Sequence, residues 1–527
     1  MSLGILLSLA ACTGTTGGAV DSASVADYTL NLRPIVPLDL NPFDGADRID
    51  LLLDSGVGDP VRITLDAPAA GDSALAEGLP ALDGTRIIVE GYSGGELVAW
   101  GRSAPVIAVN GEVEATIFVS GPEAIGKLGG LPEPDADGAG AALGDGRFVV
   151  MGGSGNRTSG NVDKTTDAMW VLDLEEPEEG LAFTEIGAMP SYVDAKGDEQ
   201  SKRRGFTLTR LTAGDAGKFL MVGGGPSYGY GDSTELTAEA RLFDPETLNF
   251  EDAIPDKDAL SNARSSHRAI GNQQGAVLVW GGFGSTPDAG QFILLADGEL
   301  YDPAQRSFSS IIGVDDGGSV GVVLADLGDD GTLVAGGARM EGNNWAISDA
   351  SLAVSLRGDV DELSGMDPMA GGAAVTLADG DVVVFGGVSS NASFAQDAAA
   401  VATDQVWRFR HGSNTWEEVG KLEVERAGHT ATAIDDTHVL IAGGSTTWSP
   451  FAFGATALSC VEIYDVATDT SSMLERCDEQ DDAVGLPGRA EAPLALDDPD
   501  LGIVFVGGVD GENGAVATTS FYGRAPD

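Results

Sequence analysis

Histidine, cysteine and tyrosine are the side chains most able to hold a metal ion or react with a substrate, and this sequence has few of them. Its 527 residues include 4 His, 3 Cys and 8 Tyr. It contains no His-x-His, His-Glu-x-x-His or Cys-x-x-Cys spacing, so it predicts no zinc or other transition-metal site. We assign no metal ligand, cofactor or catalytic residue from the sequence, and whether the chain is an enzyme stays open.

Asp-rich turns are the other place where the sequence could hold an ion, because calcium prefers carboxylate oxygens. The strongest candidate is Asp326-Leu-Gly-Asp329-Asp330-Gly331. Asp is also common in short turns because its side chain accepts bonds from nearby backbone N–H groups. We expect this turn role, with a calcium site as the alternative.

The overall charge argues against two classes of partner. Asp and Glu number 82 against 29 Lys and Arg, which gives a formal net charge of −53. Such a surface repels phosphate backbones and anionic lipid headgroups, so we expect no nucleic-acid partner. The 75 Gly and 23 Pro residues are typical of a protein with many short strands and tight turns.

The first residues have the pattern of an export signal. Residues 3–11 form an apolar run that is too short to span a bilayer and ends in small residues before Cys12. Leu9-Ala10-Ala11-Cys12 resembles the bacterial lipobox, although no Lys or Arg precedes the run. The resemblance implies that residues 1–12 are a lipoprotein signal peptide with its lipidated Cys12. Residues 13–26 are then a flexible tether.

This interpretation predicts a lipid-anchored protein of the bacterial cell envelope, on the outer membrane or facing the periplasm. Contact with the membrane is expected only through the lipid anchor, since no later segment has 18 consecutive apolar residues. The alternative is that residues 3–11 form a buried N-terminal strand.

Residues 27–121 have the pattern of a small β domain. Apolar and polar residues alternate between turn signals such as Asp83-Gly84 and Asn110-Gly111. The number of short strands predicts an immunoglobulin-like β-sandwich. No Cys lies in this segment, so the sandwich has no disulfide between its sheets, and we assign no chemistry to it.

Seven apolar strands that each end in a pair of glycines dominate the remaining residues. Successive first glycines are 71, 58, 55, 50, 57 and 64 residues apart, a period typical of repeats of about 50 residues with insertions. The pairs are Gly152-Gly153, Gly223-Gly224, Gly281-Gly282, Gly336-Gly337, Gly386-Gly387, Gly443-Gly444 and Gly507-Gly508.

The landmarks around each pair have a constant order. A small-residue strand and a tight turn come before it, and a strand with an aromatic residue, a turn and a fourth strand follow. This order resembles the kelch repeat, although the fourth repeat has Ala353-Val354-Ser355 where the aromatic is expected. The resemblance implies an all-β fold, with residues 122–527 forming a seven-bladed kelch-type β-propeller.

The seventh repeat ends too early to hold its own fourth strand. Its aromatic strand reaches Tyr522, close to the C-terminus. Residues 123–130 resemble the fourth strand of the fifth repeat at Glu417–Leu422. We therefore expect the segment before the first repeat to complete the seventh blade and close the ring.

Kelch propellers include the galactose-oxidase-like copper enzymes, whose site needs two Tyr, two His and a Cys crosslinked to Tyr. His267 and His429 each begin a first strand, where kelch repeats use His to pack blades together. His411 lies in a hairpin turn and His438 begins a second strand, so the sequence predicts no copper site.

Cys460 and Cys477 flank a predicted hairpin of the sixth repeat. Pairing about a turn at 467–470 would place 466 opposite 471, and therefore Cys460 opposite Cys477. An exported protein meets oxidising conditions, so we expect a disulfide between them.

The loops between second and third strands are long and carry aromatic residues. In a propeller they emerge on the same face as the links between blades, and exposed aromatics suit sugar rings or a protein interface. The alternative is that these rings fold back over their own loops. The candidate ligand-binding residues are Tyr228, Tyr230, Phe283, Trp345, Phe394, Trp448 and Phe451.

Two functional classes follow from these patterns. The favoured one is a cell-envelope lipoprotein that acts as a binding scaffold for a glycan, peptide or protein partner at the cell surface through the long-loop face. The alternative is a carbohydrate-active enzyme of oxidase or lyase type that uses the central mouth of the propeller.

Overall fold

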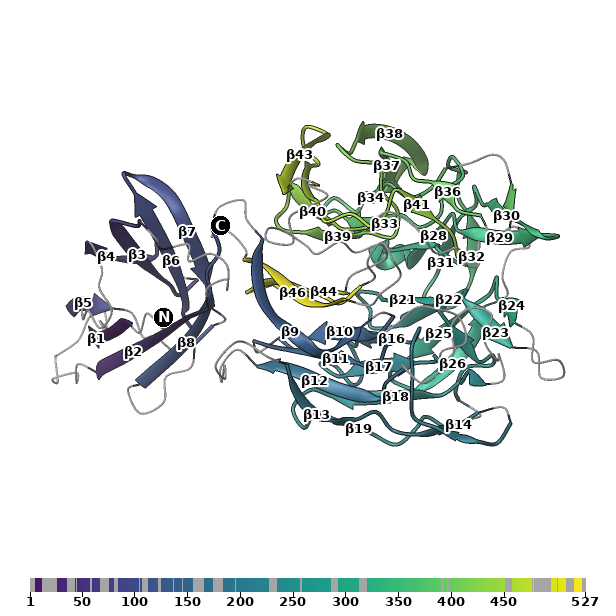
Figure 1. Cartoon of the computed structure of the whole chain (residues 1–527), viewed down its shortest axis with the longest axis horizontal. Coiled ribbons are helices and arrows are strands. Elements are labelled where there is room, and N and C mark those ends of the chain that lie inside the picture. Colours follow the sequence, from purple (N-terminus) through teal and green to yellow (C-terminus); the bar gives the residue numbers. More distant parts are fainter. Residues whose placement is uncertain are drawn as a thin grey trace, which may run out of the picture.

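The protein is described from a computed structural model of the whole chain (Figure 1). The structure describes residues 5–11, 26–35 and 43–523, except for 44, 57–58, 67–74, 80–83, 104, 107–111, 122–124, 136, 145, 155–164, 174–182, 195, 227–234, 256–257, 286–291, 312–319, 390–392, 396–397, 451–456, 476, 478–493, 500 and 509–515.

Two four-stranded sheets form the N-terminal sandwich. One has the order β5-β1-β2-β8 and the other β4-β3-β6-β7. Ile49 and Leu51 of one sheet and Ile117 of the other are buried, as alternating apolar positions require. The strands are β1 (Ile5–Ala11), β2 (Ala26–Ile35), β3 (Arg48–Asp54), β4 (Val61–Asp66), β5 (Leu75–Leu79), β6 (Arg86–Ser93), β7 (Glu96–Arg102) and β8 (Glu112–Phe118).

The apolar N-terminal run is part of this sandwich. β1 pairs antiparallel with β2 and parallel with β5. This is the strand arrangement that the sequence offered as the alternative to a signal peptide. Cys12, the predicted lipidation site, lies outside the described residues.

Seven four-stranded antiparallel sheets form the propeller, as the glycine pairs predicted. Blade one consists of β10 (Ala139–Ala142), β11 (Arg147–Met151), β12 (Ala168–Asp173) and β13 (Thr184–Ala188). Blade two consists of β16 (Thr207–Arg210), β17 (Phe219–Val222), β18 (Ala240–Asp244) and β19 (Asn249–Phe250). Blade three consists of β21 (Arg268–Gly271), β22 (Val277–Trp280), β25 (Gly298–Asp302) and β26 (Ser307–Ile311). Blade four consists of β27 (Val323–Asp326), β28 (Thr332–Ala335), β31 (Ser351–Val354) and β32 (Val360–Glu362). Blade five consists of β33 (Ala373–Thr376), β34 (Val382–Phe385), β37 (Gln405–Arg410) and β38 (Thr415–Lys421). Blade six consists of β39 (Thr430–Ala433), β40 (His438–Ala442), β42 (Val461–Asp465) and β43 (Thr470–Glu475).

Blade seven joins the two ends of the propeller. Its order is β44-β45-β46-β9, from β44 (Leu494–Asp498), β45 (Gly502–Val506), β46 (Val516–Gly523) and β9 (Gly126–Asp135). Figure 1 shows the yellow C-terminal strand β46 beside the blue strand β9. The first strands of neighbouring blades contact one another all the way round, from β10 through β44 and back to β10. The expected closure is therefore present.

Smaller sheets lie in the long connections. They are β14 (Tyr192–Val193) with β15 (Glu199–Gln200); β20 (Arg264–Ser265), β23 (Phe283–Ser285) and β24 (Phe292–Leu294); β29 (Ala338–Glu341), β30 (Asn344–Ile347) and β35 (Phe394–Ala395); and β36 (Ala400–Val401) with β41 (Thr447–Trp448). The 3-10 helices η3 (Gly328–Asp330) and η4 (His411–Ser413) lie in turns. No helix within the described ranges is long and apolar enough to cross a membrane.

The glycine pairs are the joints between blades. A Cβ on Gly223 would lie 2.5 Å from the carbonyl oxygen of Arg264, in the segment that leads to the next blade. The N–H of Gly224 donates to that same carbonyl at 2.8 Å. The first glycine has φ +68° and the second +89°, a region that side chains disfavour. Close approach and backbone geometry together require glycine here.

Buried arginine–glutamate pairs fix three blades and were not predicted. Arg264 lies 2.9 Å from Glu299 in blade three and also donates to the Gly281 carbonyl at 3.2 Å. Arg426 and Glu462 make the equivalent pair in blade six, with both side chains fully buried. Burial lowers the pKa of Arg426, and the Glu462 carboxylate opposes that shift. The third pair is Arg203 with Glu239 in blade two.

The structure joins Cys460 and Cys477 in a disulfide, with 4.5 Å between their Cα atoms. The predicted register around it is wrong, because Asp465 rather than residue 466 begins the turn and pairs with Thr470. A bulge between Val461 and Glu462 then shifts the pairing and brings position 477 beside 460.

The sandwich contacts the propeller at blade seven. Trp100 of β7 donates its indole N–H to the carbonyl of Gly523 at 3.2 Å. The side chain of Arg102 donates to the carbonyl of Pro499. Figure 1 shows the sandwich beside blade seven, with β9 following β8 in the chain.

Candidate functional site at the mouth of the central channel

A ring of left-handed residues surrounds one end of the propeller's central channel. In six blades a residue just before the first strand has positive φ, while the matching segment of blade seven lies outside the described residues. Backbone bonds link neighbours, as between Ser266 N–H and the Gly205 carbonyl at 2.7 Å. The ring members are Asp137, Gly205, Ser266, Gly321, Gly371 and Gly428.

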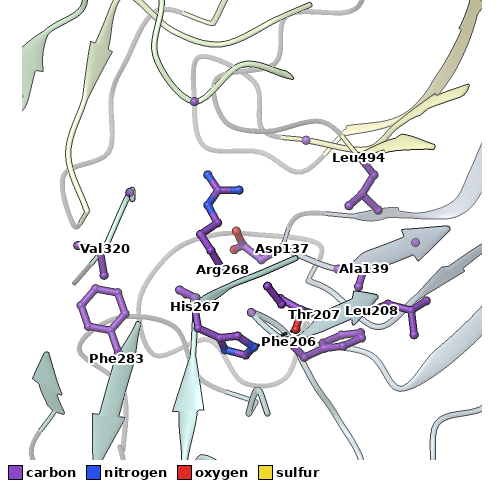
Figure 2. Close-up of a pocket in the computed structure, with 18 of the residues that line it drawn as sticks. Asp137, Ala139, Phe206, Thr207, Leu208, His267, Arg268, Phe283, Val320 and Leu494 are labelled. Carbon is purple, nitrogen blue, oxygen red and sulfur yellow. Dashed lines mark hydrogen bonds between the residues drawn. The ribbon is translucent and has the colours of Figure 1, made fainter. Parts of the chain in front are cut away.

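A cavity of about 350 Å³ opens inside this ring. Residues of the first strands in blades one to three and seven form one wall, among them Ala139, Thr207 and Leu494 (Figure 2). Phe283 and Trp448, from the long loops, form part of the other wall. The cavity therefore joins a rigid strand wall to an aromatic loop wall on the long-loop face.

Arg268 is the residue that distinguishes this cavity. Its side chain is exposed within the channel, and Figure 2 shows its guanidinium directed into the open space. No hydrogen bond or ion pair joins it to another residue that the structure describes. Desolvation by the surrounding protein lowers its pKa below the ordinary value, but an arginine stays charged at neutral pH. Arg264, four residues earlier, is paired with Glu299 instead.

The cavity also contains a buried histidine beside a hydroxyl. His267 Nε2 lies 3.0 Å from Thr207 Oγ1, and its buried Nδ1 has no partner. Burial and the charge of Arg264 lower the pKa of His267 to about 3, so the ring is neutral. An orphaned buried N–H costs more than an unpaired acceptor. The proton therefore belongs on Nε2 and is donated to Thr207.

Both first-strand histidines pack blades together, as the sequence predicted. A Cβ on Gly223 of blade two would lie 3.0 Å from the Cε1 atom of His267 in blade three. A Cβ on Gly386 would lie 2.9 Å from the Cε1 atom of His429. Burial lowers the pKa of His429 to about 3 as well. These imidazoles fill the space that the glycine pairs leave open.

The expected patch of exposed aromatics is wrong for the residues that the structure describes. Phe283 is 2% exposed, Trp345 0% and Trp448 8%, and Phe394 is half-buried. They lie in one hydrophobic cluster, which we call the loop-face core, with Val320, Ala338, Ile347, Ala370, Val388, Ala402, Ala427, Leu294, Met340 and Ala400. Tyr228, Tyr230 and Phe451 lie outside the described residues.

The physical reason is that the long loops form their own small sheets. Trp345 of β30 pairs with Phe394 of β35, and Trp448 of β41 pairs with Ala400 of β36. A Cβ on Gly321 would lie 2.5 Å from the Trp448 ring, so this ring packs on the glycines of the mouth. The aromatics support one wall of the cavity instead of forming a free surface.

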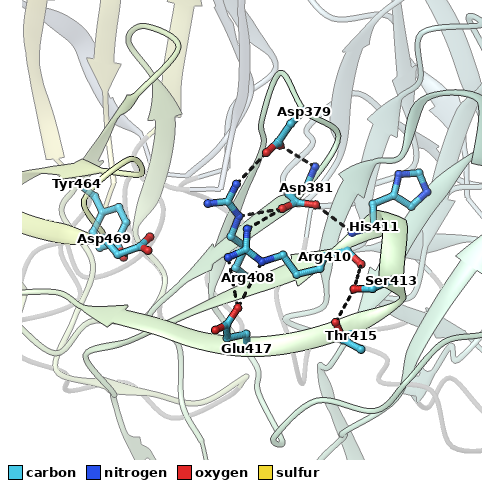
Figure 3. Close-up of polar contacts among 10 residues, drawn as sticks. All are labelled: Asp379, Asp381, Arg408, Arg410, His411, Ser413, Thr415, Glu417, Tyr464 and Asp469. Carbon is cyan, nitrogen blue, oxygen red and sulfur yellow. Dashed lines mark hydrogen bonds and ion pairs between the residues drawn. The ribbon is translucent and has the colours of Figure 1, made fainter.

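The Asp-rich turns use their carboxylates within the fold. Asp326 accepts the N–H of Gly328 at 3.0 Å, and Asp330 lies 2.9 Å from His411 Nε2. In the next blade, Arg408 bonds both Asp379 at 2.9 Å and Asp381 at 3.0 Å (Figure 3). No group of three or more potential metal ligands gathers among the described residues. The calcium alternative therefore has no support at these turns.

The cavity lacks the side chains of a galactose-oxidase-like copper site among its described residues. Its described lining includes one His and no Tyr or Cys. That single imidazole is buried, and its Nε2 is bonded to Thr207. Cys460 and Cys477 are joined in the blade-six disulfide. These residues do not fit the copper site, so we derive no step through copper.

The Gly-x-Ser-x-Gly spacing of a hydrolase nucleophile elbow occurs at three places that the sequence analysis did not name: Gly91–Gly95, Gly225–Gly229 and Gly317–Gly321. Ser227 and Ser319 lie outside the described residues, so the structure describes Ser93 alone of the three serines. An elbow is a sharp turn from a strand into a helix. Here Ser93 pairs with Glu96 across the hairpin between β6 and β7. Gly91, Gly94 and Gly95 therefore belong to a hairpin, and Ser93 does not lie at a nucleophile elbow.

A scan against protein-family models found no match, and a search of curated proteins found none. Solved structures with a similar fold include a fungal alcohol oxidase of the AA5 family in complex with copper. It has a TM-score of 0.52 and 14% identity, with 76% of each chain covered. The structure of YjhT has a TM-score of 0.44 and 16% identity, covering 66% of this chain and 99% of its own. The oxidase match supports a galactose-oxidase-like β-propeller fold, and at this identity it supports the fold alone.

Proposed function

We propose that this protein is a binding protein whose ligand enters the mouth of the central channel on the long-loop face. The observation that carries the proposal is the cavity of about 350 Å³ at that mouth. Small-molecule sites typically occupy roughly 300–1,000 Å³ and combine apolar walls with a few placed polar groups. The volume suits a sugar unit or the end of a peptide. A broad protein surface would not fit inside it.

The state of the titratable groups favours binding over proton-transfer catalysis. Asp137 is the carboxylate among the described lining residues, and it lies 2.6 Å from Arg204 in an ion pair. His267 is buried and neutral, with a pKa of about 3. A general acid or base needs a pKa near the working pH and access to the substrate. The buried His267 meets neither condition, and the Asp137 carboxylate is already engaged by Arg204.

The filling variant Thr209→Trp tests the place of binding. Thr209 lines the cavity from β16, so an indole there should occupy the ligand's space. We expect binding on an immobilised array of neutral and acidic glycans and short peptides to fall at least tenfold, with the melting temperature little changed. The matched control is Thr247→Trp, at an exposed turn of the same blade. Equal binding by Thr209→Trp and wild type would place the ligand elsewhere.

The proposal includes export and lipidation at Cys12, which the N-terminal pattern supports. Cleavage before Cys12 would remove β1 and leave one side of β2 without its partner strand. β2 would keep its parallel pairing with β8. The processed protein would therefore have a sandwich that differs from the structure of the full chain.

Mass spectrometry of the protein purified from bacterial membranes tests this part. We expect an N-terminal peptide that begins at a diacylated Cys12, and a Cys12→Ser variant that leaves the detergent-soluble membrane fraction. A double Cys460→Ser, Cys477→Ser variant is the matched control and should stay lipidated. A purified chain that still contains residues 5–11 would contradict export as a lipoprotein and favour β1 as a permanent strand.

A further inference from the structure

We propose that the channel mouth binds an oxyanion, a carboxylate or phosphate group of the ligand, through the guanidinium of Arg268 and the hydroxyl of Thr207. This inference rests on the proposed function, since it uses the same cavity. It adds the chemical class of the ligand, which neither the fold nor the sequence pattern defines.

The first argument is the contrast between Arg268 and the other arginines near the channel. Arg203 and Arg264 each have a carboxylate within hydrogen-bond distance, at 2.6 and 2.9 Å. Arg204 lies 2.6 Å from Asp137. Arg268 has no such neighbour among the described residues, although acidic residues outnumber basic ones 82 to 29. At the channel mouth, Arg268 is therefore a cation that no described carboxylate neutralises and that a ligand can pair.

The surroundings of Arg268 make an unpaired charge unfavourable. The walls of the channel limit the water around its guanidinium and lower its pKa. A charge that is partly desolvated and unpaired costs free energy, which an opposite charge recovers. Guanidinium donors form a planar fork that matches a carboxylate or a phosphate with two parallel bonds. An oxyanion is therefore the complementary ligand group.

Thr207 supplies the second donor. It lies on β16, in the blade next to that of Arg268, and both side chains line the cavity (Figure 2). Because His267 donates its Nε2 proton to Thr207 Oγ1, the hydroxyl proton of Thr207 is available to a further acceptor. The neutral histidine thus orients a hydroxyl donor toward the cavity and adds no charge.

The overall electrostatic field of the protein does not favour an anion site. A net charge of −53 repels anions at long range, so a non-specific anion should avoid the surface. Binding of an anion at the mouth must therefore depend on local donors. This makes the inference sensitive to single substitutions.

Titration calorimetry with D-glucuronate, inorganic phosphate and D-glucose tests the inference on the full chain. We expect one or both oxyanions to bind, and glucose to bind more weakly or not at all. Arg268→Gln should weaken oxyanion binding roughly 10- to 100-fold, the usual effect of losing a charge-assisted bond. The oxyanion affinity of Arg268→Lys should lie between those of the wild type and Arg268→Gln. The matched control is Arg357→Gln, at an exposed turn between β31 and β32, which should bind as wild type does.

Variants of the hydroxyl give a second, independent test. Thr207→Ser should keep binding, and Thr207→Val should weaken it about threefold to tenfold. Arg268→Gln should not lower the melting temperature, because no hydrogen bond or ion pair to a described residue is lost.

Each outcome decides for or against the oxyanion. If neither oxyanion binds the wild type, or if Arg268→Gln binds them equally well, the inference is wrong. A neutral ligand whose binding is lost in Thr209→Trp and kept in Arg268→Gln would overturn the oxyanion site. That same result would leave the proposed function standing. Tighter binding of glucuronate would indicate that the ligand carries a carboxylate, and tighter binding of phosphate would indicate that it carries a phosphate group.

Discussion

A variant in which residues 121–131 are replaced by a Gly-Ser linker of equal length should lose the closed propeller. The replaced segment includes the first half of β9, the outer strand of blade seven. Ile125, Leu128 and Leu131 are each about 5% exposed. Loss of each buried side chain costs about 2–5 kcal/mol, so the sum approaches the whole stability of an ordinary domain, about 5–15 kcal/mol.

The expected result is a chain that aggregates or unfolds well below the wild-type melting temperature, because β46 becomes an unpaired edge. Scanning calorimetry and size-exclusion chromatography measure both effects. The control is Glu133→Ala, an exposed position on the same strand, which should behave as wild type. A linker variant that stays monomeric and melts at the wild-type temperature would refute closure by β9.

Trp345→Ala should destabilise the loop-face core by about 3–5 kcal/mol, the usual cost of removing a fully buried tryptophan. Trp345 is 0% exposed and packs with Phe283 and Trp448 in one cluster. Because Phe283 and Trp448 also line the cavity, ligand binding should weaken together with stability. Denaturant unfolding and array binding measure the two effects.

Trp416→Ala is the matched control for this prediction. Trp416 is half-buried on the outer strand of blade five and donates one hydrogen bond to Ser351 Oγ at 3.0 Å. Removing the Trp416 side chain should lower the free energy of unfolding less than Trp345→Ala does, and it should leave ligand binding unchanged. If Trp345→Ala abolished binding with no loss of stability, Trp345 would be a direct ligand contact, as the sequence first indicated.

The propeller could be predicted because its signals are local and repeated. All seven glycine pairs follow an apolar strand, and in blades one, two, four and five the first glycine meets a backbone carbonyl of the segment that leads to the next blade. The same physical requirement therefore recurs along the chain. The strand swap was also predictable, since residues 123–130 resemble the fourth strand of another repeat. Both predictions follow from comparing short segments of the sequence with one another, so they need no knowledge of how distant residues meet.

The loop aromatics could not be placed from the sequence. Trp345 and Phe394 are 49 residues apart in sequence and meet through pairing of β30 with β35. Neither the repeat period nor the turn residues encode that pairing. Aromatics in long polar loops therefore looked available to a ligand, whereas burial of their large apolar surface stabilises the loops themselves.

Arg268 was missed for a related reason. Arg264 and Arg268 look alike in the sequence, and they differ only in whether a carboxylate meets them in space. A signal for the paired arginines did exist. An Arg three residues before a first-strand His occurs together with a Glu two residues before the third-strand Tyr, as in Arg264 with Glu299 and in Arg426 with Glu462. Arg268 follows its His and falls outside that pattern.

A crystal structure of the wild-type protein with a ligand found on the array tests the central claim most directly. The account predicts ligand density in the cavity between Thr207 and Trp448, with an acidic group of the ligand within hydrogen-bond distance of Arg268. Density confined to the short-turn face, to the outer strands or to the sandwich would contradict it, since the ligand would then bind without using the mouth of the channel.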